Sequence, residues 1–253
     1  MDAGQVENLR NAYNKENPKT PVSSGGTSKV WKDLQKRMEE KCNAGQKECI
    51  AAHLLERPKA PEAWKEKPDQ WLTSTDINTM EKRFEKLFDK YKYVGSFPID
   101  FNEHSETGKC LVSTLCSLDL RSLYKKGYHH IGLIFNTDVS TGPGQHWIAA
   151  FCDIDPSLEY PRMTYFDSYA HKPEPQIAEL MNKWKEQWDK TGLQKPMQLT
   201  YNGTRHQKKN TECGMYSIYF HYSCLMGIPM GKRIPDEVVQ GLRGLLFKVS
   251  KQK

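Results

Sequence analysis

The sequence predicts an α+β fold, in which a sheet packs against helices, with a small helical module ahead of it. Short apolar runs rich in β-branched and aromatic residues, bounded by Gly, Pro, Asn or Asp, indicate strands at residues 129–135, 147–153 and 162–166. Other segments repeat apolar residues at helical spacing. Prolines at positions 58, 61 and 68 interrupt any helix between the two parts. We therefore expect a leader and helical module over residues 1–68 and a core over residues 69–253.

The N-terminal part divides into a polar leader and two helices. The first 28 residues end in a Ser- and Gly-rich stretch, so a flexible leader is expected there. A helix should follow from an N-cap at Thr27 or Ser28, because apolar residues recur at helical spacing from Val30 to Cys42. Residues 50–55 repeat the pattern, and the two helices would form a hairpin.

The core begins with a helix that is capped by Ser74 or Thr75 and has an apolar face from Ile77 to Tyr91. The three strands named above follow it. A further strand is expected around residues 197–201, and further helices are expected at residues 174–189, 213–226 and 235–249.

The composition favours a soluble globular protein. Apolar residues make up 37% of the chain, and no apolar run approaches the roughly 18 residues that a membrane-spanning helix needs. The net charge of +6 is spread along the chain, so nucleic-acid binding has weak support. The N-terminus lacks the basic flank and apolar stretch of a secretory signal. An intracellular, reducing location without a membrane partner is expected.

The seven cysteines are an odd number in a long chain, which favours reduced thiols over a disulfide framework. Cys42 and Cys49, with His53 behind them, lack the close Cys-x₂₋₄-Cys spacing of a zinc site. Two thiols are therefore expected there, without a metal.

Polar residues at strand ends and at a helix start form a candidate catalytic site. His146 opens a strand, Asp167 closes the next strand, and Cys213 begins an apolar helix. A helix N-terminus and a neighbouring imidazolium both favour the thiolate form of cysteine. Cys213 would then be the nucleophile, His146 the base, and Asp167 the residue that orients the imidazole. Gln207 would donate an N–H to the developing oxyanion.

Each of these residues also has a structural interpretation. Cysteine is usually a small buried hydrophobe, a histidine beside a tryptophan is often a satisfied core residue, and Asp167 suits a turn or a helix cap. The combination of the four residues in this order favours the catalytic interpretation.

A known family shares the order of these motifs. The order His-Trp, Asp and Gln-x₅-Cys-Gly resembles the cysteine proteases that include the Ulp SUMO proteases, adenovirus protease and the processing proteases of large DNA viruses. Within that family, the segments 136–147 and 205–217 look most like the SUMO-protease-like enzymes of African swine fever virus and related viruses. Residues 71–78 also resemble the Trp-Leu-x-x-x-x-Ile-Asn opening of the Ulp core.

The resemblance implies a central mixed sheet flanked by helices and assigns roles to five residues. His146, Asp167 and Cys213 would be catalytic, Gln207 would lie in the oxyanion hole, and Trp147 would roof a narrow passage for a glycine-rich substrate strand. No metal or organic cofactor is implied. Ulp enzymes have Asp at the position of Asp167, whereas the swine fever enzyme has Asn.

The implied function is that of a viral cysteine endopeptidase, which cleaves structural polyprotein precursors after Gly-Gly-type motifs during virion maturation, in the host cytoplasm and the virion. One alternative is an isopeptidase that removes SUMO or ubiquitin-like modifiers, which also end in Gly-Gly. A second is a non-catalytic basic protein that binds nucleic acid or capsid proteins through Arg205, Lys208 and Lys209. Three basic residues in a loop are more typical of a solvated face.

Overall fold

The computed structural model describes residues 1–42 and 46–248, so position 249 of the last expected helix lies outside the described residues. Five strands form one sheet in the order β1-β2-β3-β4-β5. They are β1 (Tyr91–Pro98), β2 (His130–Asn136), β3 (Trp147–Asp153), β4 (Arg162–Phe166) and β5 (Gln198–Tyr201). The outer pairs β1–β2 and β4–β5 are parallel, and the inner pairs β2–β3 and β3–β4 are antiparallel. The expected α+β fold with a mixed sheet is confirmed.

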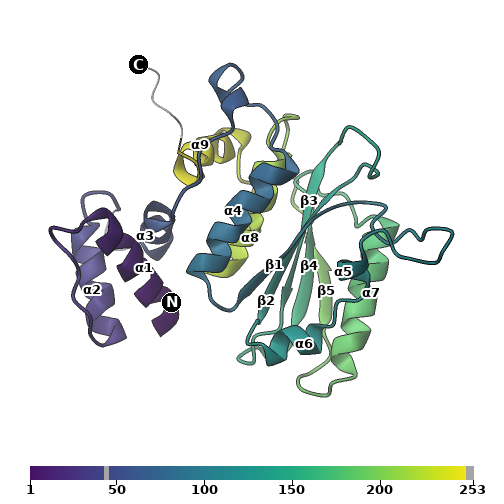
Figure 1. Cartoon of the computed structure of the whole chain (residues 1–253), viewed down its shortest axis with the longest axis horizontal. Helices are drawn as coiled ribbons and strands as arrows, with labels where there is room; N and C mark the ends of the chain where they lie inside the picture. The colour runs from purple at the N-terminus through teal and green to yellow at the C-terminus, as the bar shows by residue number, and fades with distance from the viewer. Residues whose placement is uncertain (43–45, 249–253) are drawn as a thin grey trace.

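Helices cover both faces of this sheet (Figure 1). In chain order they are α1 (Ala3–Glu16), α2 (Thr27–Arg37), α3 (Lys47–Leu54), the 3₁₀ helix η2 (Glu62–Lys65), α4 (Ser74–Leu87), α5 (Ser113–Cys116), α6 (Leu120–Lys125), α7 (Pro175–Asp189), α8 (Cys213–Met226) and α9 (Asp236–Leu246). Helices α4 and α8 lie on one face, and α5, α6 and α7 lie on the other. No helix within the described residues is long and apolar enough to span a membrane.

Side-chain alternation along the central strands produces two apolar clusters, one on each face. In β3, Ile148 and Ala150 belong to the cluster beneath α7. Ala149 and Phe151 belong to the cluster that α4 and α8 share with the N-terminal helices. Helix α8 is therefore buried between the sheet and the N-terminal helices, which explains why its sequence is apolar nearly all round.

A buried polar network fastens α8 to its surroundings. Both ring nitrogens of His221 face acceptors: Nδ1 lies 2.9 Å from Glu81 Oε1, and Nε2 lies 3.1 Å from the Ala150 carbonyl. The Tyr91 hydroxyl donates to the other carboxylate oxygen of Glu81 at 2.7 Å. Gly132 provides the space, because a Cβ there would lie 2.1 Å from the Tyr91 hydroxyl. The network thus joins α4, α8, β1 and β3.

The expectation of a flexible leader is wrong. Residues 3–16 form α1, which a capping box between Asp2 and Gln5 starts. Val6, Leu9 and Tyr13 are spaced i, i+3, i+7 and pack into the core. Because α1 contacts both α2 and α3, the N-terminal part is a three-helix arrangement rather than a hairpin.

The first core helix is shorter than expected. It ends at Leu87, and Tyr91 begins strand β1 instead of completing the helical face. The segment from Tyr91 alternates large buried and less buried side chains, which suits an edge of the sheet. The N-cap is Thr73, whose hydroxyl accepts from the N–H of Asp76 in a capping box. Glu81, also in this helix, is fully buried.

The expectation of reduced thiols is wrong for four cysteines. Cys42 is bonded to Cys49 and Cys110 to Cys116. Each pair is close in sequence, and its Cα atoms lie 5.7 Å and 6.6 Å apart respectively, within reach of a disulfide. Cys152, Cys213 and Cys224 are free.

Candidate active site

Cys213 is the first residue of α8 and is almost completely buried. The residue before it, Glu212, forms a buried ion pair with Arg243 of α9 at 2.9 Å. Arg243 also donates to the Gln70 carbonyl at 2.8 Å and stacks over the Trp64 ring. These contacts fix the start of α8, where N–H groups without intrahelical acceptors and the positive end of the helix dipole meet the thiol.

His146 and Asp167 are brought together by the antiparallel pairing of β3 with β4. His146 immediately precedes β3 and Asp167 immediately follows β4, so the two side chains meet at one edge of the sheet. His146 Nε2 lies 2.7 Å from Asp167 Oδ1. The Cys213 thiol lies close enough to His146 to contribute to the raised pKa of the imidazole. Sequence-distant residues 146, 167 and 213 therefore form one contiguous chain of polar groups.

The electrostatics of the site favour a protonated His146 beside an ionised Asp167. Burial by itself lowers the pKa of His146, but the hydrogen bond with Asp167 and the interaction with the Cys213 thiol outweigh burial and raise that pKa to about 9. Burial by itself raises the pKa of Asp167, but the partners of its carboxylate hold the net pKa below the ordinary value. Those partners include His146 and the backbone N–H of Tyr169, which donates at 2.9 Å.

The other two free thiols lie in a different environment. Burial, with the nearby carboxylate of Asp153, raises the pKa of Cys152 and of Cys224 well above the ordinary value. Neither residue lies at a helix start, since Cys152 is inside β3 and Cys224 is near the end of α8. Among the three free cysteines, Cys213 alone combines a helix N-terminus with an imidazole partner.

Gln207 lies fully buried in the loop that leads to α8. Its side-chain oxygen accepts a hydrogen bond from the Ser168 hydroxyl at 2.6 Å, and its Nε2 donates to the Lys209 carbonyl at 2.7 Å. Since an amide carries two N–H donors, one remains after the bond to Lys209. The backbone N–H of Gln207 donates to the Ser168 carbonyl at 2.9 Å, which ties the loop to the end of β4.

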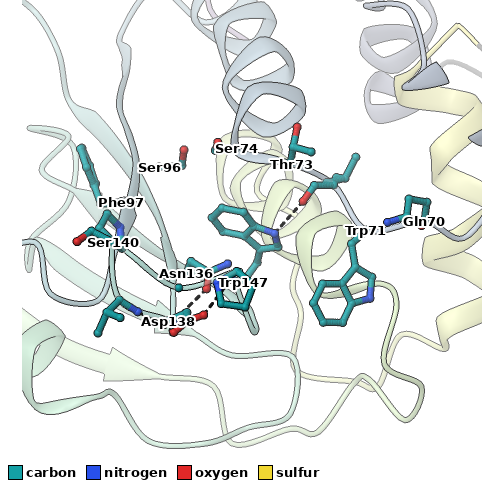
Figure 2. A pocket seen from close by; sticks show the side chains of 16 residues that line it. Gln70, Trp71, Thr73, Ser74, Ser96, Phe97, Asn136, Asp138, Ser140 and Trp147 are labelled. Atoms are coloured by element: carbon teal, nitrogen blue, oxygen red, sulfur yellow. Dashed lines mark hydrogen bonds between the residues drawn. The ribbon is translucent and has the colours of Figure 1, made fainter. Parts of the chain in front are cut away.

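Trp147 lies between the helix start and a surface cavity (Figure 2). Its indole Nε1 donates to the Leu72 carbonyl at 2.9 Å. Gly214, next to Cys213, allows this approach, because a Cβ there would lie 3.3 Å from Trp147 and 3.2 Å from Leu72. The adjoining cavity has a volume of about 590 Å³ and includes Trp71 and Ser96 among its lining residues. Trp147 lines this cavity, whereas His146, Asp167, Gln207 and Cys213 do not.

Several groups at this site were not singled out from the sequence. Ser168 orients Gln207, and Tyr169 packs its ring 5.0 Å from that of His146. The pair of Glu212 and Arg243 carried no local signal, since its members are 31 residues apart. The Tyr-Phe-Asp-Ser-Tyr run around Asp167 was the available signal for Ser168 and Tyr169, because polar groups that follow a strand end tend to gather with its neighbours.

The chain is similar in sequence to viral thiol proteases. A protein of Acanthamoeba polyphaga mimivirus that is named as a candidate thiol protease is 29% identical over 187 residues, or 72% of this chain. The cysteine protease of African swine fever virus (isolate Tick/Malawi/Lil 20-1/1983) is 32% identical over 130 residues, or 50% of this chain. These matches span 58% and 46% of the relatives' own lengths, so the chain covers about half of each. No protein-family model matches the chain.

Solved structures share the fold. The crystal structure of the African swine fever virus protease has a TM-score of 0.65 at 20% identity, and the match covers 97% of this chain and 90% of that one. The Ulp1 protease domain, in complex with the yeast orthologue of SUMO, has a TM-score of 0.51 at 17% identity, covering 71% of this chain and 76% of that one. The chain is thus similar in sequence to these viral cysteine proteases, and it has the fold of the African swine fever virus protease and of the Ulp1 protease domain.

Proposed function

We propose that this chain is a cysteine endopeptidase that cleaves viral structural polyprotein precursors after Gly-Gly-type motifs during virion maturation. The observation that carries the proposal is the contiguous series Asp167, His146 and Cys213, which ends in a thiol at a helix N-terminus. That arrangement supplies an activated nucleophile, a proton carrier and an orienting carboxylate.

In the proposed reaction, the Cys213 thiolate attacks the scissile carbonyl carbon while His146 carries the proton. The backbone N–H of Cys213 and the remaining amide hydrogen of Gln207 would donate to the oxyanion. His146 then transfers its proton to the leaving amine, and the C–N bond breaks to leave a thioester on Cys213. Water, deprotonated by His146, hydrolyses the thioester and restores the thiolate–imidazolium pair. Asp167 holds the ring orientation throughout.

The preference for glycine follows from the crowding beside Trp147. Leu72, Trp147 and Gly214 are already in contact at the helix start, so little width remains for substrate side chains next to the scissile bond. Residues further upstream would occupy the cavity beside Trp147, whose wall mixes aromatic rings with polar groups, the carboxylate of Asp138 among them.

Cleavage of matched peptides tests the proposal. The purified chain, kept reduced, is assayed against peptides that contain Gly-Gly-x, Gly-Ala-x and Ala-Gly-x, together with its Cys213→Ala variant. Cleavage of Gly-Gly-x alone, absent in Cys213→Ala, is the expected result. Cys224→Ala is the matched control, because it removes a free thiol from the same helix and should keep full activity. Activity in Cys213→Ala would refute the nucleophile assignment.

A second candidate function uses the same chemistry on a modifier conjugate. It is favoured because relatives from African swine fever virus are named SUMO-1 cysteine proteases and Ulp1 was solved with a SUMO orthologue. A SUMO conjugate is therefore included in the same assay. A kcat/KM for the conjugate well above that for the best Gly-Gly-x peptide would make deconjugation the function.

We place the proposed activity in the reducing cytoplasm of the host, at the assembly site, and in the virion. A free thiol at Cys213 is needed for the reaction, and an oxidising compartment would endanger it. Thiol labelling of the protein in infected cells, read by mass spectrometry, tests this location.

If neither peptide nor conjugate is cut, the non-catalytic alternative is favoured, in which Arg205, Lys208 and Lys209 bind nucleic acid. The affinity for nucleic acid should then weaken as the salt concentration increases.

A further inference from the structure

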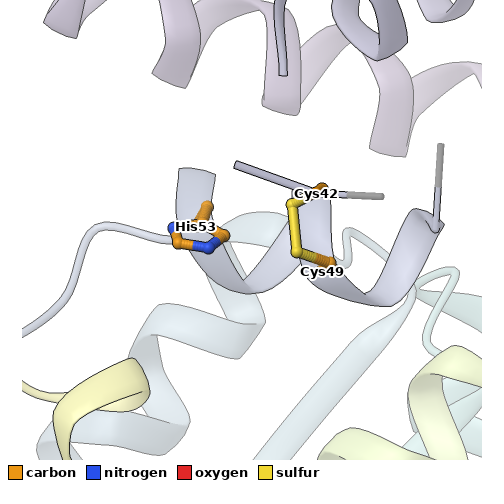
Figure 3. A group of neighbouring side chains, drawn as sticks. All are labelled: Cys42, Cys49 and His53. Atoms are coloured by element: carbon orange, nitrogen blue, oxygen red, sulfur yellow. A yellow bond between two sulfur atoms is a disulfide. The ribbon is translucent and has the colours of Figure 1, made fainter. Parts of the chain in front are cut away.

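A group of three potential metal ligands, Cys42, Cys49 and His53, lies in the N-terminal part of the chain (Figure 3). Cys42 follows α2, and its N–H donates to the Met38 carbonyl at 2.8 Å. Cys49 and His53 stand four residues apart in α3, so they project from one face of that helix toward Cys42. The two sulfur atoms and a ring nitrogen of His53 all lie within 4.8 Å of one another.

This spacing is within about 1 Å of what a single zinc ion requires. Zinc binds thiolate at about 2.3 Å and imidazole at about 2.1 Å, so tetrahedral geometry places ligand atoms on one ion about 3.5–3.8 Å apart. The three ligand atoms, which lie within 4.8 Å of one another, would therefore move by about 1 Å at most, beyond the opening of the S–S bond. Two thiolates balance the charge of a divalent ion.

We propose that Cys42, Cys49 and His53 form a redox-gated metal site that binds a zinc-class divalent cation when the cysteines are reduced. A thiol reductant opens the site: two molecules of R–SH reduce the disulfide to two protein thiols and leave as R–S–S–R. Metal binding then releases the two thiol protons, so that both sulfurs bind as thiolates. Water would fill the fourth position, because the residues that the structure describes supply three ligands.

The site is linked to the helix that carries Cys213. Glu48, which adjoins Cys49, accepts a hydrogen bond through its backbone carbonyl from the Tyr222 hydroxyl of α8 at 2.5 Å. An ion that joins the segment after α2 to α3 therefore also stabilises α3, whose Glu48 carbonyl holds Tyr222 of α8. Because a ligand that binds only the folded state stabilises it by mass action, the metal should raise the melting temperature of the reduced protein.

The test uses the full chain with Cys213→Ala, so that the candidate nucleophile does not compete for metal. Reduced protein is titrated with Co²⁺ as a spectroscopic probe, and Zn²⁺ is then added to displace it. We expect one equivalent of tetrahedral, thiolate-ligated Co²⁺ and a higher melting temperature with Zn²⁺. Oxidised protein should bind neither ion, because a disulfide offers no thiolate.

The variants replace the two half-buried ligands, Cys49 and His53, because replacement of the buried Cys42 could disrupt the fold. Cys49→Ser and His53→Asn should each weaken binding at least 100-fold, because even outer-shell partners of metal ligands are worth about 10 to 100-fold. The double variant Cys110→Ser/Cys116→Ser is the matched control, because it removes the other cysteine pair and should leave binding unchanged. Binding that persists in Cys49→Ser, that is lost in the control, or that is absent from the reduced parent protein would overturn the proposal.

Discussion

Arg243 of α9 lies 2.9 Å from the carboxylate of Glu212, the residue immediately before α8, and both side chains are almost fully buried. Burial raises the pKa of Glu212, and the partnership with Arg243 opposes that rise. The ion pair thus joins the C-terminal helix to the position next to Cys213.

Removal of the guanidinium should be strongly destabilising. Arg243→Met leaves a buried carboxylate without its partner, which costs about 3–5 kcal/mol of unfolding free energy. Urea unfolding measures the loss. Lys195→Met is the control, because its ion pair with Glu159 is exposed and is worth less than about 1 kcal/mol. Equal losses in the two variants would contradict the role assigned to Arg243.

The pH dependence of cleavage should depend on Asp167. The protonated form of His146 is present below its pKa of about 9 and is lost above it, so kcat/KM should fall as pH rises through about 9. Asp167→Asn removes the carboxylate that favours the imidazolium, so this alkaline limb should move down by about 1–3 pH units. His171→Asn is the control, because this exposed histidine contacts Asp167 without contacting Cys213. The alkaline limb of kcat/KM should keep its position in this variant. An unmoved limb in Asp167→Asn would show that another group sets it.

Gln207 should affect kcat more than KM. Gln207→Ala removes an N–H donor from the proposed oxyanion site, and loss of one such donor costs about 100 to 1,000-fold in kcat. Ser168→Ala keeps the amide and removes only the hydroxyl that orients it, so a loss below about tenfold is expected from the weaker positioning. Steady-state kinetics with the Gly-Gly-x peptide measure both variants. A change confined to KM would place Gln207 in substrate binding instead.

Gly214 should be sensitive to a single added methyl group. In Gly214→Ala the new Cβ would press on Leu72 and Trp147, so both must shift by a few tenths of an ångström. Because misplacement by about 1 Å costs about 100-fold in rate, we expect kcat/KM to fall by about tenfold. Gly241→Ala in α9 meets open space, and it should keep activity while adding about 0.5–1 kcal/mol of stability. Unchanged activity in Gly214→Ala would argue against a narrow passage at Trp147.

The sequence predicted the elements whose signals are local. Strands β3 and β4 and helix α8 have the expected bounds, because each is a dense apolar run with polar or turn residues at its ends. Tyr91, the first residue of strand β1, fits the face of the preceding helix because it continues the spacing of Leu87, whereas its alternation with Tyr93 is the stronger signal. Helix α1 was missed because only three of its residues enter the core.

The positions of His146, Asp167 and Cys213 at the ends of elements could be inferred from the sequence. The buried side-chain pairs that fix those elements could not. Each of the three stands at the end of an element, and such positions are visible as changes in residue pattern. The pairs His221 with Glu81 and Arg243 with Glu212 join residues 140 and 31 positions apart. Contacts between residues so far apart in sequence depend on how the helices pack. A single sequence contains no local pattern that indicates them.

Helix α8 is held near both ends, by Arg243 through Glu212 at its start and by Tyr222 against the Glu48 carbonyl in its last turn. With the sheet and the N-terminal helices on its sides, the backbone beneath Cys213 has few alternative conformations. The conformational entropy that must be lost to position the Cys213 thiol is therefore lost when the chain folds. In the proposed reaction, substrate binding would spend none of its free energy on ordering that part of the site, and the protein would reach the attack geometry with its thiol already in place.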